Sequence, residues 1–278
     1  MAFAAGDAAA SVSVSSTLFL SESGIRIMTY CLGLRLNAGM VFVSDSRTNA
    51  GVDFISAYRK CFVFDQSDDR IIVILTAGNL AITQSVISLL EDRAEGGDPK
   101  RSLYAAPSMF EVARIIGNTL REVHAEDAES LRQHNTEFNA SMIVGGQIRG
   151  RRMRMFNVYA AGNFIEAGED TPYLQIGETK YGKPIIERVV TMDTPLVEAA
   201  KCALVSFDST IKSNLSVAPP LDMVIVPIDS LKAQVRWRIT EDDPYFLDIR
   251  RRWGEGLRSL FVDLPDPAAV VGGLENGS

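Results

Sequence analysis

"IRIMTYCLGLRLNAGMVFVSDSRTNAG", residues Ile25 to Gly51, contains two short apolar runs separated by "NAG". The runs Tyr30–Leu36 and Met40–Ser44 are rich in β-forming residues, and a short glycine-containing connection between them predicts a β-hairpin. Met28 and Thr29 stand directly before the first run, so a possible translation start is followed by a residue with a nucleophilic hydroxyl. The stretch therefore predicts the first strand pair and raises the question of what Thr29 does there.

The length and composition of the chain indicate a folded globule. The chain has 278 residues, of which 46% are hydrophobic, which suits one sizeable domain or two small ones. The net charge of −7 argues against a nucleic-acid partner, because such proteins normally carry a basic face.

The cysteines and histidines do not form a recognisable metal or catalytic pattern. Cys31, Cys61 and Cys202 are widely spaced in apolar stretches, so we expect buried thiols in a reducing compartment rather than disulfides. His124 and His134 lie ten residues apart in a charged stretch, which favours solvated helix positions over a zinc site or a catalytic triad.

The first 24 residues are rich in Ala and Ser and lack a positively charged start and a long apolar run. A signal peptide or membrane span is therefore not expected, and we predict a cytoplasmic protein. Residues 1–28 are interpreted as a disordered extension, a propeptide or the result of a mis-assigned start.

Hydrophobic periodicity predicts further hairpins and helix pairs along the rest of the chain. Beyond the opening hairpin, the expected strands are Arg59–Phe64, Ile71–Thr76, Ser141–Gln147, Met153–Ala160, Pro172–Gly177, Leu221–Pro227 and Lys232–Ile239. The expected helices are Asn79–Glu95, Pro107–Glu126, Gly182–Val190, Pro195–Ser213 and a docked terminal helix, Asp243–Val262.

Blocks of hairpins and blocks of helices, without strict β-α-β alternation, predict an α+β fold with two stacked antiparallel sheets and helices outside them. No composition shift divides the chain, so we expect a single domain over residues 29–263 and a flexible tail over 264–278. The basic turn that carries Arg149, Arg151, Arg152 and Arg154 is interpreted as a solvent-facing or interface segment rather than an anion site.

Several segments together resemble a known family. The stretches "TYCLGLRLNAGMVFVSDSRTNAG", "YRKCFVF", "ILTAGN", "MIVGGQ" and "LQIGETKYGKP" are similar, in order and spacing, to the proteasome β-type fold of N-terminal nucleophile (Ntn) hydrolases. The closest resemblance is to the Anbu, or ancestral β-subunit, group of bacterial proteasome-type peptidases, and it extends over nearly all of the chain from Thr29. It implies a four-layer αββα sandwich.

The resemblance implies that Thr29 is the nucleophile and that its own free α-amine is the base. Such an amine titrates at about 7.7 to 8.0 in model peptides, so near neutral pH a usable fraction accepts the hydroxyl proton. If residues 1–28 stay attached, the base does not exist. The family usually has Gly before the threonine, where this chain has Ile27-Met28. We therefore favour translation from Met28 and removal of that methionine over self-cleavage of a propeptide.

The other catalytic positions carry over residue by residue. Asp45 in "SDSR" matches the aspartate that pairs with the active-site lysine, and Lys60 in "RKCF" matches that lysine, with Arg47 bracing the loop. Gly78 in "TAGN" matches the glycine whose N–H stabilises the oxyanion. Without the resemblance, Asp45 and Lys60 would be interpreted as a surface ion pair and Gly78 as a strand-to-helix turn.

Two positions depart from the family pattern. Gly177-Glu178-Thr179 stands where the family has Gly-Ser-Gly, and a carboxylate there would raise the pKa of the α-amine and weaken the base. Asn214 and Ser216 are candidates for the family's Asp-x-x-Ser segment, without a fixed register.

The resemblance implies hydrolysis of peptides or unfolded proteins without metal or organic cofactor, in a homo-oligomer that is either a ring or an open helical array, with an unfoldase partner left open. Two alternatives stay open: a non-catalytic assembly subunit, and an Ntn amidase that acts on a small or isopeptide amide.

Overall fold

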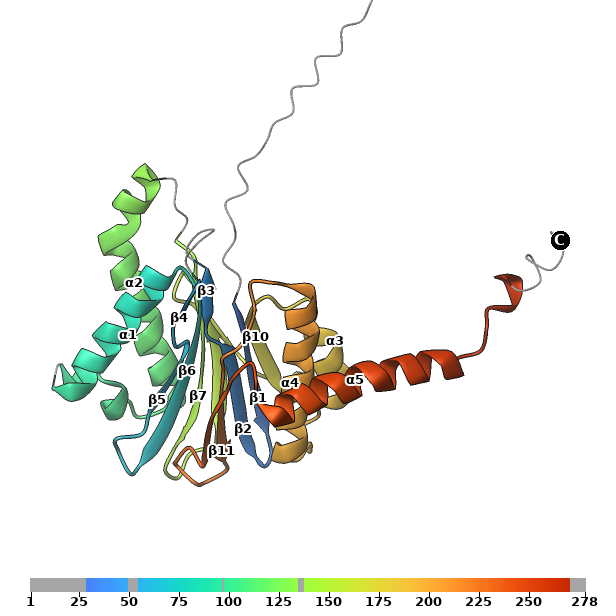
Figure 1. The fold of residues 1–278 in the computed structure, drawn as a ribbon. Coiled ribbons are helices and arrows are strands. Elements are labelled where there is room, and N and C mark those ends of the chain that lie inside the picture. The colour runs from blue at the N-terminus through green and yellow to red at the C-terminus, as the bar shows by residue number, and fades with distance from the viewer. Residues whose placement is uncertain (1–28, 50–54, 97, 135–137, 271–278) are drawn as a thin grey trace, which may run out of the picture.

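The computed structural model describes residues 29–49, 55–96, 98–134 and 138–270, and two stacked sheets with helices on their outer faces form its body (Figure 1). The first sheet has the order β10-β1-β2-β11-β12 and the second the order β5-β6-β7-β8-β9, with every neighbouring pair antiparallel. The predicted α+β sandwich is therefore confirmed. Residues 1–28, on which the extension was predicted, lie outside the described residues, as do residues 271–278 of the predicted tail.

The first sheet consists of β1 (Tyr30–Leu36), β2 (Gly39–Asp45), β10 (Tyr173–Gly177), β11 (Leu221–Pro227) and β12 (Val235–Ile239). The second consists of β5 (Cys61–Phe64), β6 (Arg70–Gly78), β7 (Ala140–Ile148), β8 (Arg154–Val158) and β9 (Phe164–Glu166). A separate two-stranded ribbon pairs β3 (Arg47–Asn49) with β4 (Ile55–Ala57).

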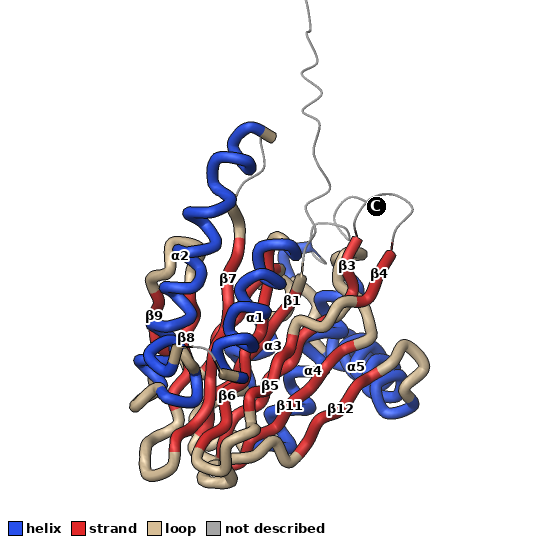
Figure 2. The backbone as a smooth tube through the Cα atoms, turned by 90° about the vertical axis from the view of Figure 1, so that its left-hand side faces the viewer, coloured by secondary structure: helices blue, strands red, loops and turns tan. Residues whose placement is uncertain are grey.

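The helices are α1 (Leu80–Glu95), α2 (Met109–Gln133), α3 (Lys183–Val189), α4 (Leu196–Ser213) and α5 (Pro244–Asp263), with two short 3₁₀ turns, η1 (Pro99–Arg101) and η2 (Leu103–Ala105). Helices α1 and α2 cover the second sheet, while α3, α4 and the start of α5 cover the first (Figures 1 and 2). Among the described residues, no helix combines the length and hydrophobicity needed to cross a bilayer.

The opening hairpin folds as its sequence predicts. Gly39 begins β2 with φ +143°, and a Cβ there would lie 2.3 Å from the carbonyl oxygen of Val226 on β11. Only glycine fits this position, because the backbone of the neighbouring strand occupies the space of a side chain. The central strands are buried on both faces, so the sheet sits between a helix layer and its partner sheet.

Helix α1 starts where the sequence places its cap. The Asn79 side chain accepts hydrogen bonds from the N–H groups of Ala81 and Ile82 at 3.0 and 3.4 Å. Helix α2 begins at Met109, two residues after Pro107, and the Ser108 hydroxyl accepts from Glu111 N–H at 3.2 Å. The helix also runs seven residues beyond the predicted end at Glu126. The prediction stopped too early because the second half of the helix is polar and carries little apolar periodicity.

The prediction of a docked terminal helix was wrong for half of α5. Its first two turns bury Phe246 and Ile249 against the body. The remainder projects away from the sandwich (Figure 1), with Leu257 48% and Phe261 76% exposed. The apolar residues recur at helical spacing along the whole helix. This spacing alone does not distinguish the part that packs against the body of its own chain from the part that does not.

The cysteine and histidine predictions hold in part. Cys31 and Cys202 are buried, but Cys61 is only half-buried, because β5 is the edge strand of its sheet. His124 and His134 are exposed, as expected. In the basic segment, Arg149, Arg151 and Arg152 are exposed, as expected. Arg154 instead begins β8, is half-buried and forms a two-pronged ion pair with Glu166 on β9 at 2.8 and 2.6 Å.

Candidate active site

Thr29 lies directly before β1, and its backbone is held by the segment that follows β10. The Thr29 carbonyl oxygen accepts a hydrogen bond from the N–H of Glu178 at 2.6 Å. Gly177 has φ +82°, and a Cβ on it would lie 1.8 Å from that carbonyl oxygen. Thr29 itself is only 4% exposed. The close fit fixes the position of Thr29 relative to β10.

Asp45 and Lys60 form a buried ion pair near Thr29. The Lys60 ammonium donates to Asp45 Oδ2 at 2.9 Å, and the two residues are 4% and 0% exposed. The interpretation as a surface ion pair is therefore wrong. Asp45 Oδ1 accepts from the backbone N–H of Tyr30 at 3.1 Å, so the pair is attached to the residue that follows Thr29.

Lys60 makes a second contact that explains the brace expected of Arg47. Its ammonium donates to the backbone carbonyl oxygen of Arg47 at 2.7 Å. Lys60 is therefore hydrogen-bonded to the main chain of Arg47, and the Arg47 guanidinium is not part of that contact. Two acceptors on one buried ammonium hold its orientation.

The burial of Asp45 raises the pKa of its carboxyl group. Burial raises the pKa of the Asp45 carboxyl to about 6, although the Lys60 ammonium and the Tyr30 N–H act in the opposite direction. The carboxylate is therefore ionised at neutral pH and takes up a proton on mild acidification.

Tyr30 is a site-supporting residue that the sequence interpretation missed. Its phenolic oxygen lies 2.7 Å from Ser206 Oγ and accepts from Gln175 Nε2 at 2.5 Å, and its ring packs on Phe207 with a centroid separation of 4.4 Å. Burial raises the pKa of the phenol well above its ordinary value. The only signal in the sequence is an aromatic residue directly after Thr29, which does not distinguish a core position from a supporting one.

Gly78 ends β6 in a conformation that needs glycine. Its φ is +108°, and a Cβ would lie 2.3 Å from the carbonyl oxygen of Asn139. Asn79 N–H, the next donor along, is already bonded to that oxygen at 2.7 Å. The turn that was the alternative interpretation of Gly78 is present, and its role as oxyanion donor stays a prediction.

Glu178, whose N–H binds the Thr29 carbonyl oxygen, forms one hydrogen-bonded cluster with Asn214 and Ser216. The Glu178 carboxylate accepts from the N–H of Lys180 at 3.1 Å and from Asn214 Nδ2 at 3.0 Å. Asn214 Oδ1 accepts from the N–H of Ser216 at 2.9 Å. Glu178 is 4% exposed, so these donors replace water around a buried carboxylate.

The described residues contain no group of three or more His, Cys, Asp or Glu side chains arranged to hold a metal ion. The candidate residues that the fold connects around Thr29 are Asp45, Lys60, Arg47, Glu178, Asn214 and Ser216, while Gly78 stands at the end of β6 in the partner sheet.

The four-layer sandwich, with a threonine directly before its first strand, is the fold of the proteasome-type Ntn hydrolases. Solved structures agree with it at TM-scores near 0.8. The chain belongs to the Anbu family, the ancestral β-subunit group.

The likeness to the Anbu structures extends over most of the chain. Anbu from Yersinia bercovieri is 52% identical, with 86% of this chain and 99% of that one covered and a TM-score of 0.80. The helical assembly of the Anbu complex from Pseudomonas aeruginosa is 49% identical, with 87% and 99% covered and a TM-score of 0.83. Anbu from Hyphomicrobium sp. strain MC1 is 45% identical, with 86% and 99% covered and a TM-score of 0.78. No family model and no curated protein sequence matches the chain.

Proposed function

We propose that this protein is a cytoplasmic threonine peptidase in which Thr29, as the first residue of the mature chain, is the nucleophile. The observation that carries the proposal is the buried Lys60–Asp45 pair, bonded at 2.9 Å and attached through Tyr30 N–H to the strand that Thr29 begins. A buried charge pair is costly to desolvate, so its position beside a candidate nucleophile favours a catalytic role over a stabilising one.

The proposed reaction is acyl transfer to the Thr29 hydroxyl. Thr29 Oγ attacks the peptide carbonyl carbon while the α-amine accepts the hydroxyl proton. The tetrahedral oxyanion is stabilised by Gly78 N–H, an interaction typically worth about 3 kcal/mol. The C–N bond then breaks, the leaving amine takes the proton from the α-amine, and water hydrolyses the ester to regenerate Thr29.

Lys60 acts on this chemistry through its charge. An ammonium close to Thr29 lowers the pKa of the hydroxyl and favours the neutral α-amine, and Asp45 holds that ammonium in place. The substrate is proposed to be an extended peptide or an unfolded protein, bound through main-chain hydrogen bonds. No cofactor takes part in the proposed reaction.

We further propose that the protein works as a homo-oligomer, as a ring or an open helical array. Two observations support this: a relative from Pseudomonas aeruginosa forms a helical assembly, and the projecting end of α5 exposes Leu257, Leu260 and Phe261. An unfoldase that delivers substrate is compatible with such an array.

Glu178 favours a second candidate, a non-catalytic assembly subunit. Its buried carboxylate occupies the position of the family's serine, and a negative charge there would keep the α-amine protonated. An Ntn amidase with the same nucleophile and a small or isopeptide amide substrate is the third candidate.

The decisive experiment maps covalent adducts on protein whose chain starts at Thr29. A peptide-epoxyketone, which needs both the hydroxyl and the free amine, is expected to add one inhibitor mass to the Thr29 peptide. Thr29→Ala and a chain that retains residues 1–28 are the matched controls, and neither should react. Modification that persists in Thr29→Ala, or no modification of the Thr29-start protein, would overturn the peptidase proposal. A panel of peptides and small amides then separates the two enzymatic candidates.

A further inference from the structure

The peptide group between Thr29 and Tyr30 is held at both ends. Its carbonyl oxygen accepts the hydrogen bond from Glu178 N–H at 2.6 Å, and its N–H donates to Asp45 Oδ1 at 3.1 Å. The residue on one side of this peptide group carries the candidate nucleophile, and the residue on the other side is Tyr30. Whatever holds the Tyr30 side chain therefore also helps to set the direction of the Thr29 hydroxyl.

The Tyr30 side chain fills a closed socket on the helix-covered face of the first sheet. Three segments form this socket: β10 through Gln175, the loop after β10 through Gly182, and α4 through Ser206 and Phe207. Gln175 Nε2 donates to the phenolic oxygen at 2.5 Å, which directs the phenol proton to Ser206 Oγ, 2.7 Å away. Tyr30 and Ser206 are both 0% exposed, so the two hydroxyl groups have no contact with water.

Gly182 brings the phenol and the Thr29 carbonyl group into contact with the same loop. A Cβ added to Gly182 would overlap both the Tyr30 phenolic oxygen and Ser206 Oγ, so the backbone of the loop packs directly on the hydroxyl pair. Four residues earlier, the same loop supplies the Glu178 N–H that binds the Thr29 carbonyl oxygen. A displacement of the phenol therefore also displaces the segment that holds Thr29.

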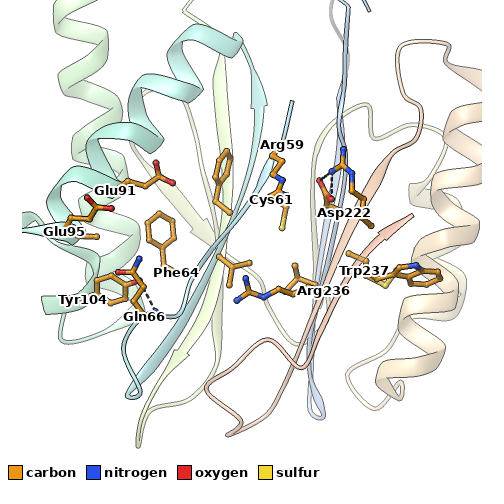
Figure 3. Close-up of a pocket in the computed structure, with 16 residues that line it drawn as sticks. Arg59, Cys61, Phe64, Gln66, Glu91, Glu95, Tyr104, Asp222, Arg236 and Trp237 are labelled. Atoms are coloured by element: carbon orange, nitrogen blue, oxygen red, sulfur yellow. Dashed lines mark hydrogen bonds and ion pairs between the residues drawn. The ribbon is translucent and has the colours of Figure 1, made fainter. Parts of the chain in front are cut away.

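The hydroxyl pair orients the Tyr30 side chain and does not bind a ligand in a groove. The groove of about 530 Å³ next to β5 is lined by residues of α1, η2, β5, β11 and β12 and of the segments that flank β5, and it includes neither Tyr30 nor Ser206 (Figure 3). A phenylalanine ring would fill the apolar part of the socket without the cost of burying two hydroxyl groups. Their presence in this core therefore favours a role in fixing one orientation of the ring.

We propose that Ser206 is a positioning residue for the peptidase reaction, which acts through the Tyr30 phenol on the peptide group between Thr29 and Tyr30. With the phenol held, the Thr29 hydroxyl keeps its direction and the Tyr30 N–H stays bonded to Asp45. With the phenol released, the start of β1 shifts, and a misplacement of about 1 Å lowers turnover by as much as about 10². The inference rests on the proposed peptidase and adds α4 to the elements that support its nucleophile.

The test uses the chain that starts at Thr29 and removes one hydroxyl at a time. Tyr30→Phe and Ser206→Ala should each lower kcat by about tenfold or more and leave KM within about twofold, because the groups that bind substrate are unchanged. The double variant should be no slower than the slower single variant, since both changes remove the same contact. Thr210→Val is the matched control. It removes an equally buried hydroxyl one turn further along α4, which donates to the Ser206 carbonyl oxygen, and it should keep the wild-type kcat.

The pH dependence of turnover separates positioning from a general loss of structure. The Tyr30 N–H and the Lys60 ammonium both lower the pKa of Asp45, against the effect of burial. Neither Tyr30→Phe nor Ser206→Ala changes Lys60, so a loosened Tyr30 N–H should move the acid limb of kcat/KM to higher pH. Thr210→Val should leave the limb in place. An unmoved acid limb in both test variants, with kcat lowered as much in Thr210→Val, would overturn the proposal.

Hydrogen exchange gives a readout that does not require turnover. In protein labelled with ¹⁵N-tyrosine, the Tyr30 N–H should exchange faster in Ser206→Ala than in the wild type or in Thr210→Val. Unchanged exchange in Ser206→Ala would overturn the anchoring of Tyr30 by Ser206. A wild type that neither hydrolyses peptides nor reacts with the epoxyketone would overturn the proposed peptidase, whatever the exchange rates. An active wild type with unchanged kcat in Tyr30→Phe and Ser206→Ala would overturn only the role of the pair in the reaction.

Discussion

Asp45 and Lys60 share one buried charge pair, with Lys60 Nζ 2.9 Å from Asp45 Oδ2 and the other oxygen of Asp45 bonded to Tyr30 N–H. The carboxylate thus connects three segments: the start of β1, the end of β2 and the entry to β5. Any change in its charge is transmitted directly to the residue beside Thr29.

Activity should fall as the pH falls through about 6, because burial raises the pKa of Asp45 to about 6 and the neutral carboxyl no longer holds Lys60. The sign for stability is opposite. The folded-state pKa lies above the ordinary value of about 3.9, so between these values the folded chain binds more protons than the unfolded one. The contribution of Asp45 to the free energy of unfolding is therefore full below about pH 3.9 and is lost as the pH rises to about 6. Profiles of kcat/KM and urea unfolding at pH 4 to 8 check both signs.

The control for this prediction is Asp45→Asn. The difference in unfolding free energy, wild type minus Asp45→Asn, should decrease as the pH rises from about 4 to about 6. An increase over that range would show that Lys60 lowers the pKa of Asp45 by more than burial raises it.

Substitution Lys60→Met should lower kcat/KM by about 10² or more, because the positive charge proposed to lower the pKa of the Thr29 hydroxyl is lost. Lys60 also opposes the effect of burial on Asp45, so its removal should move the pKa of Asp45 further up. The pH range over which the free energy of unfolding decreases as the pH rises should then extend above pH 6. Lys60→Arg is the matched variant: it keeps the charge, but a planar guanidinium cannot reproduce the ammonium contacts to Asp45 and Arg47. Full activity in Lys60→Met would remove Lys60 from the mechanism.

Gly177→Ala should abolish activity, since its Cβ would need the space of the Thr29 carbonyl oxygen, 1.8 Å away. The positive φ of +82° adds backbone strain of about 1 kcal/mol or more. Gly150→Ala separates the two effects, because Gly150 has φ +72° with no atom within 4 Å of the added Cβ. It should lose a little stability and keep its turnover. Epoxyketone labelling and thermal unfolding of both variants make the comparison, and equal turnover in both would contradict the proposed fixation of Thr29.

Glu178→Gln should raise turnover, because it removes a negative charge from the vicinity of the α-amine while the side chain remains an acceptor for Asn214 or Lys180. The acid limb of the rate profile should shift to lower pH as the pKa of the amine falls. Glu187→Gln, at the surface of α3, is the control. Reduced turnover in Glu178→Gln would mean that the buried carboxylate serves the reaction.

Replacement of Leu257, Leu260 and Phe261 by serine should weaken self-association and change the unfolding temperature little, because all three side chains are 48% to 76% exposed. Val197→Ser, at an apolar position on α4 that is 75% exposed, should leave association unchanged. Sedimentation velocity measures the first effect and differential scanning calorimetry the second. A large loss of stability would instead place the end of α5 against its own chain.

The sequence predicts most of the sandwich because its strands and helices carry clear periodicity. The "NAG" segment defines the β1–β2 hairpin, and the apolar stripe of α4 defines its buried face. Strands β3, β4 and β9 were not predicted, since three residues are too few to show alternation. Their formation depends on neighbours that are distant in the sequence.

The candidate site can be predicted from the sequence only through the family resemblance. Nothing local to Asp45 or Lys60 distinguishes a surface pair from a buried one, because their burial follows from the stacking of two sheets that are built from distant segments. The Tyr30 contacts to Gln175 and Ser206 and the use of the Arg47 carbonyl are tertiary features of the same kind.

Among the described residues, the hydrogen bond from Glu178 N–H to the Thr29 carbonyl oxygen, with Gly177 packed against it, holds Thr29 through residues that follow it in the chain. If Thr29 becomes the first residue of the chain, as proposed, these contacts to its carbonyl group do not depend on the residues removed. In the proposed peptidase, removal of the residues before Thr29 would then activate the site without the loop refolding that zymogens require.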